Sequence, residues 1–256
     1  MIVTRKNIII IVLLISAATT AVIYFFLREN FYQPLYPASL YKNLSKPAEK
    51  KGVRLLFVGD LMFDRGIRYY ADKNGSNEFI FGKIHSFLTS NDLVIANLEG
   101  PITDEKSISY NTKPGETNNY FFTFDPSVAE TLYRENIKLV NLGNNHILNF
   151  GWQGLGSTKK YLAEAGVNYF GAPGSRRSII KEINGIKIAF ISYNEFYGDA
   201  KPEQKAVMDE IKNIKPKSDV VIIFSHWGIE YSLEPADNIK NLARQFVDAG
   251  ADLIIG

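Results

Sequence analysis

From Val53 onward, short apolar runs alternate with longer amphipathic segments, and this alternation constrains the fold more than any other feature of the chain. Most of the short runs consist of valine, isoleucine, leucine and phenylalanine, which is typical of strands buried on both faces. The longer segments have the spacing of helices that pack on a sheet, so the pattern predicts an α/β domain. We expect strands at 53–59, 92–97, 138–142, 186–193, 219–225 and 252–256, and helices at 79–89, 126–136, 152–165, 202–214 and 236–249.

One antiparallel hairpin is predicted within this pattern. Asn184 and Gly185 separate the apolar runs 178–183 and 186–190, and this dipeptide is preferred at the centre of a type I′ turn. The hairpin adds an antiparallel strand to a parallel arrangement, so we expect a mixed sheet. Residues 103–119 are polar and contain glycine and proline, which predicts a long loop near the functional site.

An uncharged apolar run covers residues 8–27. Its length is that of a helix crossing a bilayer of roughly 30 Å. We therefore predict a single-pass anchor in the cell membrane, with residues 1–7 in the cytoplasm and the following domain extracytoplasmic. The alternative is a cleaved signal peptide, because small residues occur at 16–21, but the apolar run resumes at 22–27.

The rest of the chain is predicted to form a stalk and one main domain. Residues 28–52 contain prolines at 34, 37 and 47 and no sustained period, which is typical of a linker. Residues 53–256 form the domain, because a chain with 46% hydrophobic residues has enough apolar material for one sizeable core.

Composition excludes some classes of function. The formal net charge is only +2, so the chain lacks the basic excess that neutralises nucleic-acid phosphates, and we expect no nucleic-acid partner. Cysteine is absent, which removes disulfides, thiolate metal ligands and a cysteine nucleophile.

Residues able to bind metal follow four of the predicted strands. They are Asp60, Glu99, the run Asn144, Asn145 and His146, and His226. Sites in open α/β sheets lie outside the carboxyl ends of strands, so these side chains are expected to converge on one rim. Oxygen and imidazole donors together suit divalent transition metals, and a carboxylate shared by two ions holds such a pair about 4 Å apart. The pattern therefore predicts hydrolase chemistry.

Each of these residues also has an ordinary structural interpretation. Asp60 could cap a helix that begins near Asp64, and Glu99 could be a solvated turn residue. The asparagine pair could serve left-handed turn geometry, and His226 could be a partly buried histidine without a ligand. These interpretations do not explain why all the residues fall at strand ends, so we favour a shared site. His85 lies within a predicted helix, and we expect it on the surface or in the core.

Four motifs occur in order along the domain. They are Gly59-Asp60-Leu61-Met62 with Arg65, Asn97-Leu98-Glu99-Gly100-Pro101, Asn144-Asn145-His146 with Gly151, Gly154 and Leu155, and His226-Trp227-Gly228-Ile229-Glu230-Tyr231. With the closing stretch 242–256, they resemble the motifs of the CapA family of poly-γ-glutamate capsule synthesis proteins, within the calcineurin-like metallophosphatase superfamily. The resemblance runs from about Val53 to the last residue.

The resemblance implies a layered α/β/β/α sandwich with mixed sheets and a site for two divalent ions, such as Mn, Zn or Fe. Asp60 would bind the first ion, Glu99 would stand where the superfamily has a bridging Asp, and Asn145 and His226 would bind the second. His146 would be the acid that protonates the leaving group, or it would stabilise the transition state. Arg65, Asn144 and Glu230 are the implied candidates for binding or orienting the substrate.

The chain departs from the pattern at three places. Met62 stands where general superfamily members have a histidine, and Asn149 stands where the family usually has Asp. In the family, the strand at 252–256 leads into a His-Pro-His segment that supplies ligands to both ions, and here the sequence stops at Gly256. We expect either a piece of a longer protein or a protein without the complete two-ion site.

The resemblance implies a membrane-anchored protein that acts in the synthesis, release or anchoring of poly-γ-glutamate or a related capsule polymer. Its expected partners are the membrane, the anionic cell-surface polymer and other capsule synthesis components. One alternative is an extracytoplasmic phosphatase or phosphodiesterase. Another is a non-catalytic scaffold or polymer-binding subunit of a capsule synthase complex.

Overall fold

The computed structural model describes residues 52–110, 112–196 and 198–256. The predicted membrane segment at 8–27 and the predicted stalk up to residue 51 lie outside these ranges. Within the described ranges, no helix combines the length and the apolar character needed to span a bilayer.

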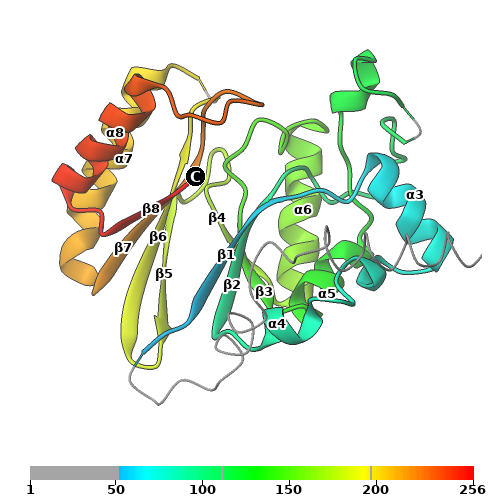
Figure 1. Ribbon diagram of the computed structural model, residues 1–256, viewed down its shortest axis with the longest axis horizontal. Helices are drawn as coiled ribbons and strands as arrows, with labels where there is room; N and C mark the ends of the chain where they lie inside the picture. Colours follow the sequence, from blue (N-terminus) through cyan, green and yellow to red (C-terminus); the bar gives the residue numbers. More distant parts are fainter. Residues whose placement is uncertain (1–51, 111, 197) are drawn as a thin grey trace, which may run out of the picture. The chain divides into compact units, whose positions relative to one another are not determined.

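The domain contains two four-stranded sheets (Figure 1). The first has the order β1-β2-β3-β4, and all its strands are parallel. The second has the order β5-β6-β7-β8, in which β5 is antiparallel to β6 and the other pairs are parallel. The strands are β1 (Leu55–Leu61), β2 (Leu93–Leu98), β3 (Ile137–Asn141), β4 (Asn168–Phe170), β5 (Ser178–Ile183), β6 (Ile186–Asn194), β7 (Val220–His226) and β8 (Leu253–Ile255). The prediction of mixed sheets therefore holds for the second sheet and is wrong for the first.

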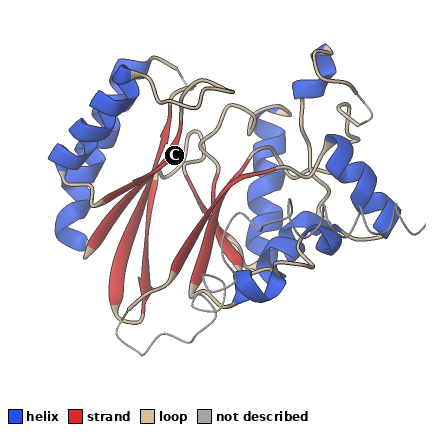
Figure 2. Ribbon diagram, in the orientation of Figure 1, coloured by secondary structure: helices blue, strands red, loops and turns tan. Residues whose placement is uncertain are grey.

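Helices cover the outer face of each sheet (Figure 2). On the first sheet these are α4 (His85–Thr89), α5 (Ser127–Arg134) and α6 (Gly151–Ala165), and on the second α7 (Ala200–Ile214) and α8 (Asp237–Ala249). Helix α3 (Arg65–Asn74) lies farther from the strands, beyond the helices of the first sheet. Short 3-10 turns occur at Asn77–Ile80, Thr117–Tyr120 and Lys215–Lys217. The order of layers is helix, sheet, sheet, helix.

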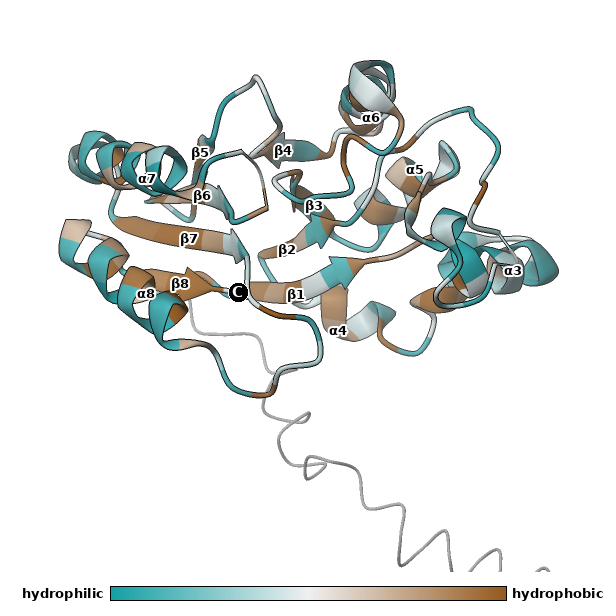
Figure 3. Cartoon of the chain, turned by 90° about the horizontal axis from the view of Figure 1, so that it is seen from above, coloured by the Kyte–Doolittle hydropathy of each residue, from teal (hydrophilic) through white to brown (hydrophobic). Residues whose placement is uncertain are grey.

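Alternation along the strands produces this layering. In β2, Val94, Ala96 and Leu98 pack into a core shared with α5 and α6, whereas Leu93 and Ile95 face a core formed mainly by strand residues of both sheets. Successive side chains of a strand point to opposite faces, so one apolar run supplies both cores. A third core joins the second sheet to α7 and α8. Figure 3 shows β7 and β8 mainly hydrophobic, and α7 and α8 mixed in character as amphipathic helices are.

Local sequence accounts for several boundaries. Asn184 and Gly185 have φ angles of 53° and 82°, as the two central positions of a type I′ turn require. The predicted helix at 79–89 is wrong in its first half, where Gly82 interrupts it and only His85–Thr89 is α-helical. Helix α3 is capped by Asp64, whose carboxylate accepts a hydrogen bond from Arg65 N, and not by Asp60. Asp60 is therefore free of the capping role.

Candidate metal centre

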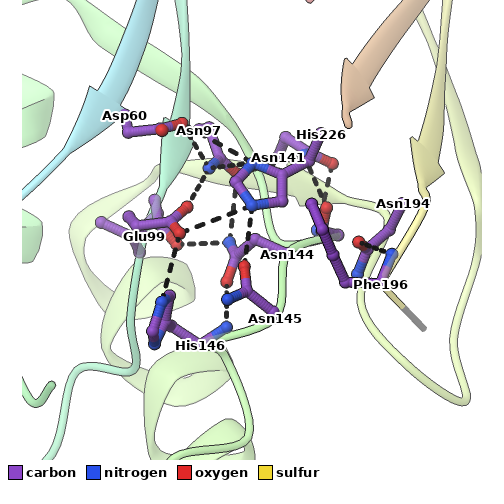
Figure 4. Close-up of polar contacts among 12 residues, drawn as sticks. Asp60, Asn97, Glu99, Asn141, Asn144, Asn145, His146, Asn194, Phe196 and His226 are labelled. Atoms are coloured by element: carbon purple, nitrogen blue, oxygen red, sulfur yellow. Dashed lines mark hydrogen bonds and ion pairs between the residues drawn. The ribbon is translucent and has the colours of Figure 1, made fainter. Parts of the chain in front are cut away.

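Three strand ends and one loop bring the predicted residues together (Figure 4). Asp60 lies near the end of β1, Glu99 directly follows β2, and His226 is the last residue of β7. Asn145 and His146 lie in the loop after β3. Because β1 and β2 belong to the first sheet and β7 to the second, the site lies where the two sheets meet.

Asp60, Glu99 and His226 form a group that could hold a metal ion. One ligand atom from each lies within 4.8 Å of the others. His226 Nε2 is 3.5 Å from Glu99 Oε1, and His226 Nδ1 is 3.8 Å from Asp60 Oδ1. Asn145 joins this group because its Oδ1 accepts a hydrogen bond of 2.8 Å from His226 Nε2. All four residues that the sequence predicts as metal ligands thus lie together.

The electrostatics of the group fit a cation. The pKa of Glu99 is raised to about 8, first by burial and then by the nearby Asp60 carboxylate, while a hydrogen bond from Asn97 opposes the shift. Within the described ranges, ion pairs link these two carboxylates only to histidines, and burial lowers the pKa of both His146 and His226. Among the described residues, no lysine or arginine forms an ion pair with the two carboxyl groups, and a divalent cation at this position would balance their charge.

Asn97 organises the two carboxylates. Its side-chain NH₂ donates to Asp60 Oδ1 at 2.8 Å and also to Glu99 Oε2. Its Oδ1 accepts hydrogen bonds of 3.1 Å from both Asn141 and Asn144. The side chain is buried, so these contacts are protected from water. Asn97 belongs to one of the family motifs, but its position within a strand gave it no predicted role. The feature that could have identified it is a polar amide side chain inside an otherwise apolar strand.

His146 lies beside the metal centre, with Nε2 3.8 Å from Glu99 Oε1. Its Nδ1 is 3.2 Å from Asn149 Oδ1, an atom that also accepts a hydrogen bond from Phe122 N. An amide oxygen only accepts, so His146 Nδ1 carries the hydrogen and Nε2 keeps its lone pair. The Phe122 ring packs on the imidazole at 4.3 Å between centroids. These contacts fix both the orientation and the tautomer of His146.

The three predicted substrate-binding residues differ in position. Arg65 and Glu230 line a cleft of about 450 Å³ that also contains the metal group and Met62. Asn144 is only 1% exposed. Its NH₂ donates to Asn97 Oδ1 and to Leu98 O, and its Oδ1 accepts from His146 N. These hydrogen bonds show that Asn144 positions the loop. Its side-chain polar atoms already have protein partners.

His85 lies away from the cleft, as expected. It begins α4, and its Nδ1 is 2.9 Å from Glu135 Oε2. Phe122 and Phe124 are both buried, and Phe122 also lines the cleft.

Several solved structures match part of the chain, among them one from Staphylococcus aureus and one from Thermus thermophilus. A putative 5′-nucleotidase from Staphylococcus aureus, in complex with α-ketoglutarate, has a TM-score of 0.48 and 12% sequence identity, covering 78% of this chain and 44% of that one. A hypothetical protein from Thermus thermophilus has a TM-score of 0.45 and 20% identity, covering 78% of this chain and 66% of that one.

Three of the curated relatives are named as capsule or polymer synthesis proteins. The PGA biosynthesis protein CapA of Bacillus subtilis is 30% identical over 216 residues, covering 78% of this chain and 55% of the relative. The capsule biosynthesis protein CapA of Bacillus anthracis is 25% identical over 230 residues, covering 82% of this chain and 55% of the relative. A probable polyglutamine synthesis accessory protein of Mycobacterium tuberculosis is 28% identical over 200 residues, covering 66% and 50%. The chain spans about half the length of these relatives.

A family model settles the relationship. The model of the bacterial capsule synthesis protein PGA_cap matches residues 54–256, which is nearly the whole predicted domain. The motif resemblance to CapA is confirmed by this match and by the Bacillus relatives. The chain belongs to the bacterial capsule synthesis protein family.

Proposed function

We propose that this domain is a metal-dependent, hydrolase-type unit of an extracytoplasmic capsule synthesis protein. It would act in the synthesis, release or anchoring of poly-γ-glutamate or a related anionic polymer. The observation that carries the proposal is the convergence of Asp60, Glu99 and His226 in one cleft with His146 beside them. The choice of polymer is supported by relatives named for PGA biosynthesis and for polyglutamine synthesis.

In this proposal Asp60, Glu99, Asn145 and His226 would supply the ligands that this sequence offers to divalent cations, and Mn, Zn and Fe are the first metals to test. Bound metal supplies hydroxide near neutral pH and stabilises charge that develops on an attacked carbonyl or phosphoryl group. Glu99 would be the shared ligand if two ions bind, and its contacts with His226 and with the Asn97 amide that also binds Asp60 support this role. Asn97 keeps both carboxylates turned toward the cleft.

His146 is proposed as the residue that protonates the leaving group. Its Nδ1 hydrogen is held by Asn149, so Nε2 is the atom that takes up and releases the proton. Burial lowers the pKa of His146, so the imidazole rests neutral near pH 7 and its protonated form is a stronger acid than an exposed histidine.

Hydrolysis assays with two substrates test the proposal. Wild type, His146→Ala and His85→Ala are compared on poly-γ-glutamate and on a chromogenic phosphodiester with added Mn²⁺. We expect His146→Ala to lower turnover by about 100-fold or more, the usual contribution of a general acid, while His85→Ala behaves as wild type.

Each outcome of these assays selects a function. Turnover of the phosphodiester alone would favour the phosphatase or phosphodiesterase alternative. Metal binding without turnover of either substrate would favour the non-catalytic scaffold. Turnover that is indifferent to His146→Ala would contradict the proposed acid.

The proposed location is the outer face of the cell membrane, with the membrane and other capsule synthesis components as partners. The apolar run at residues 8–27 supports this part of the proposal. A protease added to intact cells should remove the domain. Protection of the domain in intact cells would contradict the exported orientation.

A further inference from the structure

Arg65 is held in an unusual backbone conformation at the edge of the cleft. Its φ angle is 53°, in the left-handed region that costs a non-glycine residue on the order of 1–2 kcal/mol. Asp64 stabilises this conformation, because its buried carboxylate accepts hydrogen bonds from Arg65 N at 2.9 Å and Thr123 N at 2.9 Å. Strain retained at a cleft suggests that the direction of the side chain matters.

The side chain of Arg65 is pre-organised by three neighbours. Its Nε donates a hydrogen bond of 2.6 Å to Asn119 O. Its guanidinium carbon lies 4.5 Å from the centre of the Phe122 ring and 5.4 Å from that of Tyr120. Within the described part of the chain, its two terminal nitrogens have no hydrogen-bond partner. The guanidinium is therefore fixed at one end and open at the other.

The positive charge of the Arg65 guanidinium distinguishes it from the other side chains of the cleft. Of the described residues lining the cleft, Arg65 is the one with a permanent positive charge. Asp60, Glu99 and Glu230 supply acidic groups to the same lining. An acidic ligand that enters the cleft has one fixed cationic side chain to meet.

We infer that Arg65 is the specificity-determining residue of this cleft and that it binds an acidic group of the ligand, a carboxylate or a phosphate, through its two terminal nitrogens. Two parallel N–H donors match the two oxygens of such a group, a geometry that lysine cannot reproduce. The Phe122 ring that supports Arg65 also packs on His146, so the bound acidic group would lie beside the proposed reacting centre. The inference rests on the proposed function in that it uses the same cleft.

Equilibrium binding to the full 256-residue chain in detergent tests this inference. The probes are a γ-linked glutamate oligomer, the corresponding uncharged γ-linked glutamine oligomer, and a non-hydrolysable phosphodiester. The variants are Arg65→Met, which removes the charge, and Arg65→Lys, which keeps it without the planar fork. Arg244→Met is the matched control, because Arg244 is exposed on α8 and bonds only Asn241 among the described residues.

We expect Arg65→Met to weaken binding of at least one anionic probe by about 10-fold to 100-fold, the value of a charge-assisted hydrogen-bond pair. Arg65→Lys should recover part of that loss, and the glutamine oligomer should change by less than about twofold, since it offers no charge to recognise. A selective effect on the glutamate oligomer identifies a carboxylate as the recognised group, and one on the phosphodiester identifies a phosphate.

Three results would overturn the inference. They are wild-type affinity in Arg65→Met, an equal loss for the uncharged oligomer, and failure of the wild type to bind either anionic probe. Thermal unfolding shows whether each variant is folded. If Arg65→Met is misfolded, the affinities of Arg65→Lys and wild type are compared instead. A parallel Mn²⁺ titration separates the two proposals, because absent metal binding contradicts the proposed function without changing the result for Arg65.

Discussion

Glu99 is buried and lies near the Asp60 carboxylate and two histidines. Its protonation state therefore differs between the folded and the unfolded protein. Its pKa is raised from 4.5 to about 8, first by burial and then by Asp60. Between these two values the metal-free folded protein keeps a proton that the unfolded chain has released. The stability of the metal-free protein therefore falls as pH rises through this window.

The window from pH 7 to pH 8 isolates Glu99. Burial lowers the pKa of His146 and His226, so above about pH 7 both are largely neutral, folded or unfolded. We predict that the unfolding free energy of metal-free protein decreases by about 1 kcal/mol across this unit of pH, and that Glu99→Gln abolishes the decrease. Urea unfolding in the presence of a chelator measures both. A flat profile for wild type, or an equal decrease in the variant, would contradict the pKa of Glu99.

Asn97 should matter as much as the ligands it holds. Asn97→Ala leaves the Asp60 and Glu99 carboxylates and the Asn141 and Asn144 amides without a shared partner. We predict a loss of about 1–3 kcal/mol in unfolding free energy and about 10-fold to 100-fold weaker metal binding. Asn213→Ala on the exposed end of α7 is the control. Metal affinity equal to that of the control would show that Asn97 does not orient the ligands.

Helix α3 and the loop after β2 are joined by one buried carboxylate. Asp64 accepts hydrogen bonds from Arg65 N, Arg68 Nε, Ser107 Oγ and Thr123 N. The predicted loop at 103–119 is thereby tied to the start of α3, with a short 3-10 turn at Thr117–Tyr120 near its end. This connection places Asn119, Tyr120 and Phe122 beside the cleft.

We predict that Asp64→Ala destabilises the domain by about 2–3 kcal/mol, because four donors lose a buried acceptor. The amide of Thr123 should exchange with solvent much faster in the variant, since its partner is Asp64 Oδ2. Hydrogen exchange measures this, with Asp248→Ala on the exposed face of α8 as control. Unchanged protection of Thr123 would contradict the proposed connection.

Secondary structure was predictable where a local pattern is strong. The apolar runs that become β2, β6 and β7 are long enough to specify buried strands, and the ends of β2 and β7 place Glu99 and His226 at the rim. Strand β4 was missed because its residues, Asn168–Phe170, form too short a run. Strand β4 forms because it pairs with the free edge of β3. This pairing depends on tertiary structure, which the local sequence pattern does not show.

The sequence predicted which residues form the site better than it predicted the contacts between them. Asn144 and Asn145 are adjacent in the sequence, yet Asn144 is buried in hydrogen bonds to the first sheet whereas Asn145 meets His226 from the second. Periodicity cannot distinguish them, because the loop after β3 has no regular repeat. The same limit applies to Asn97, whose role depends on its register opposite Asn141.

The fold as a unit explains why the site is shared by two sheets. Asp60 and Glu99 come from the first sheet, and His226 comes from the second. The core between the sheets contains residues such as Ile95, Phe190 and Phe224, so packing fixes one sheet against the other. Metal binding should therefore stabilise the contact between the sheets, since a ligand that binds only the folded state raises its stability.

Divalent-metal titration of the purified 256-residue chain is the decisive measurement. Mn²⁺, Zn²⁺ and Fe²⁺ are tested by calorimetry and elemental analysis on wild type, Glu99→Gln, His226→Ala and the control His85→Ala. We predict stoichiometric binding of at least one of these metals by wild type and His85→Ala, with affinity at least about tenfold weaker in the two site variants. A wild-type protein that stays free of metal after equilibration with each ion, or a His226→Ala variant that binds as His85→Ala does, would contradict the metal centre.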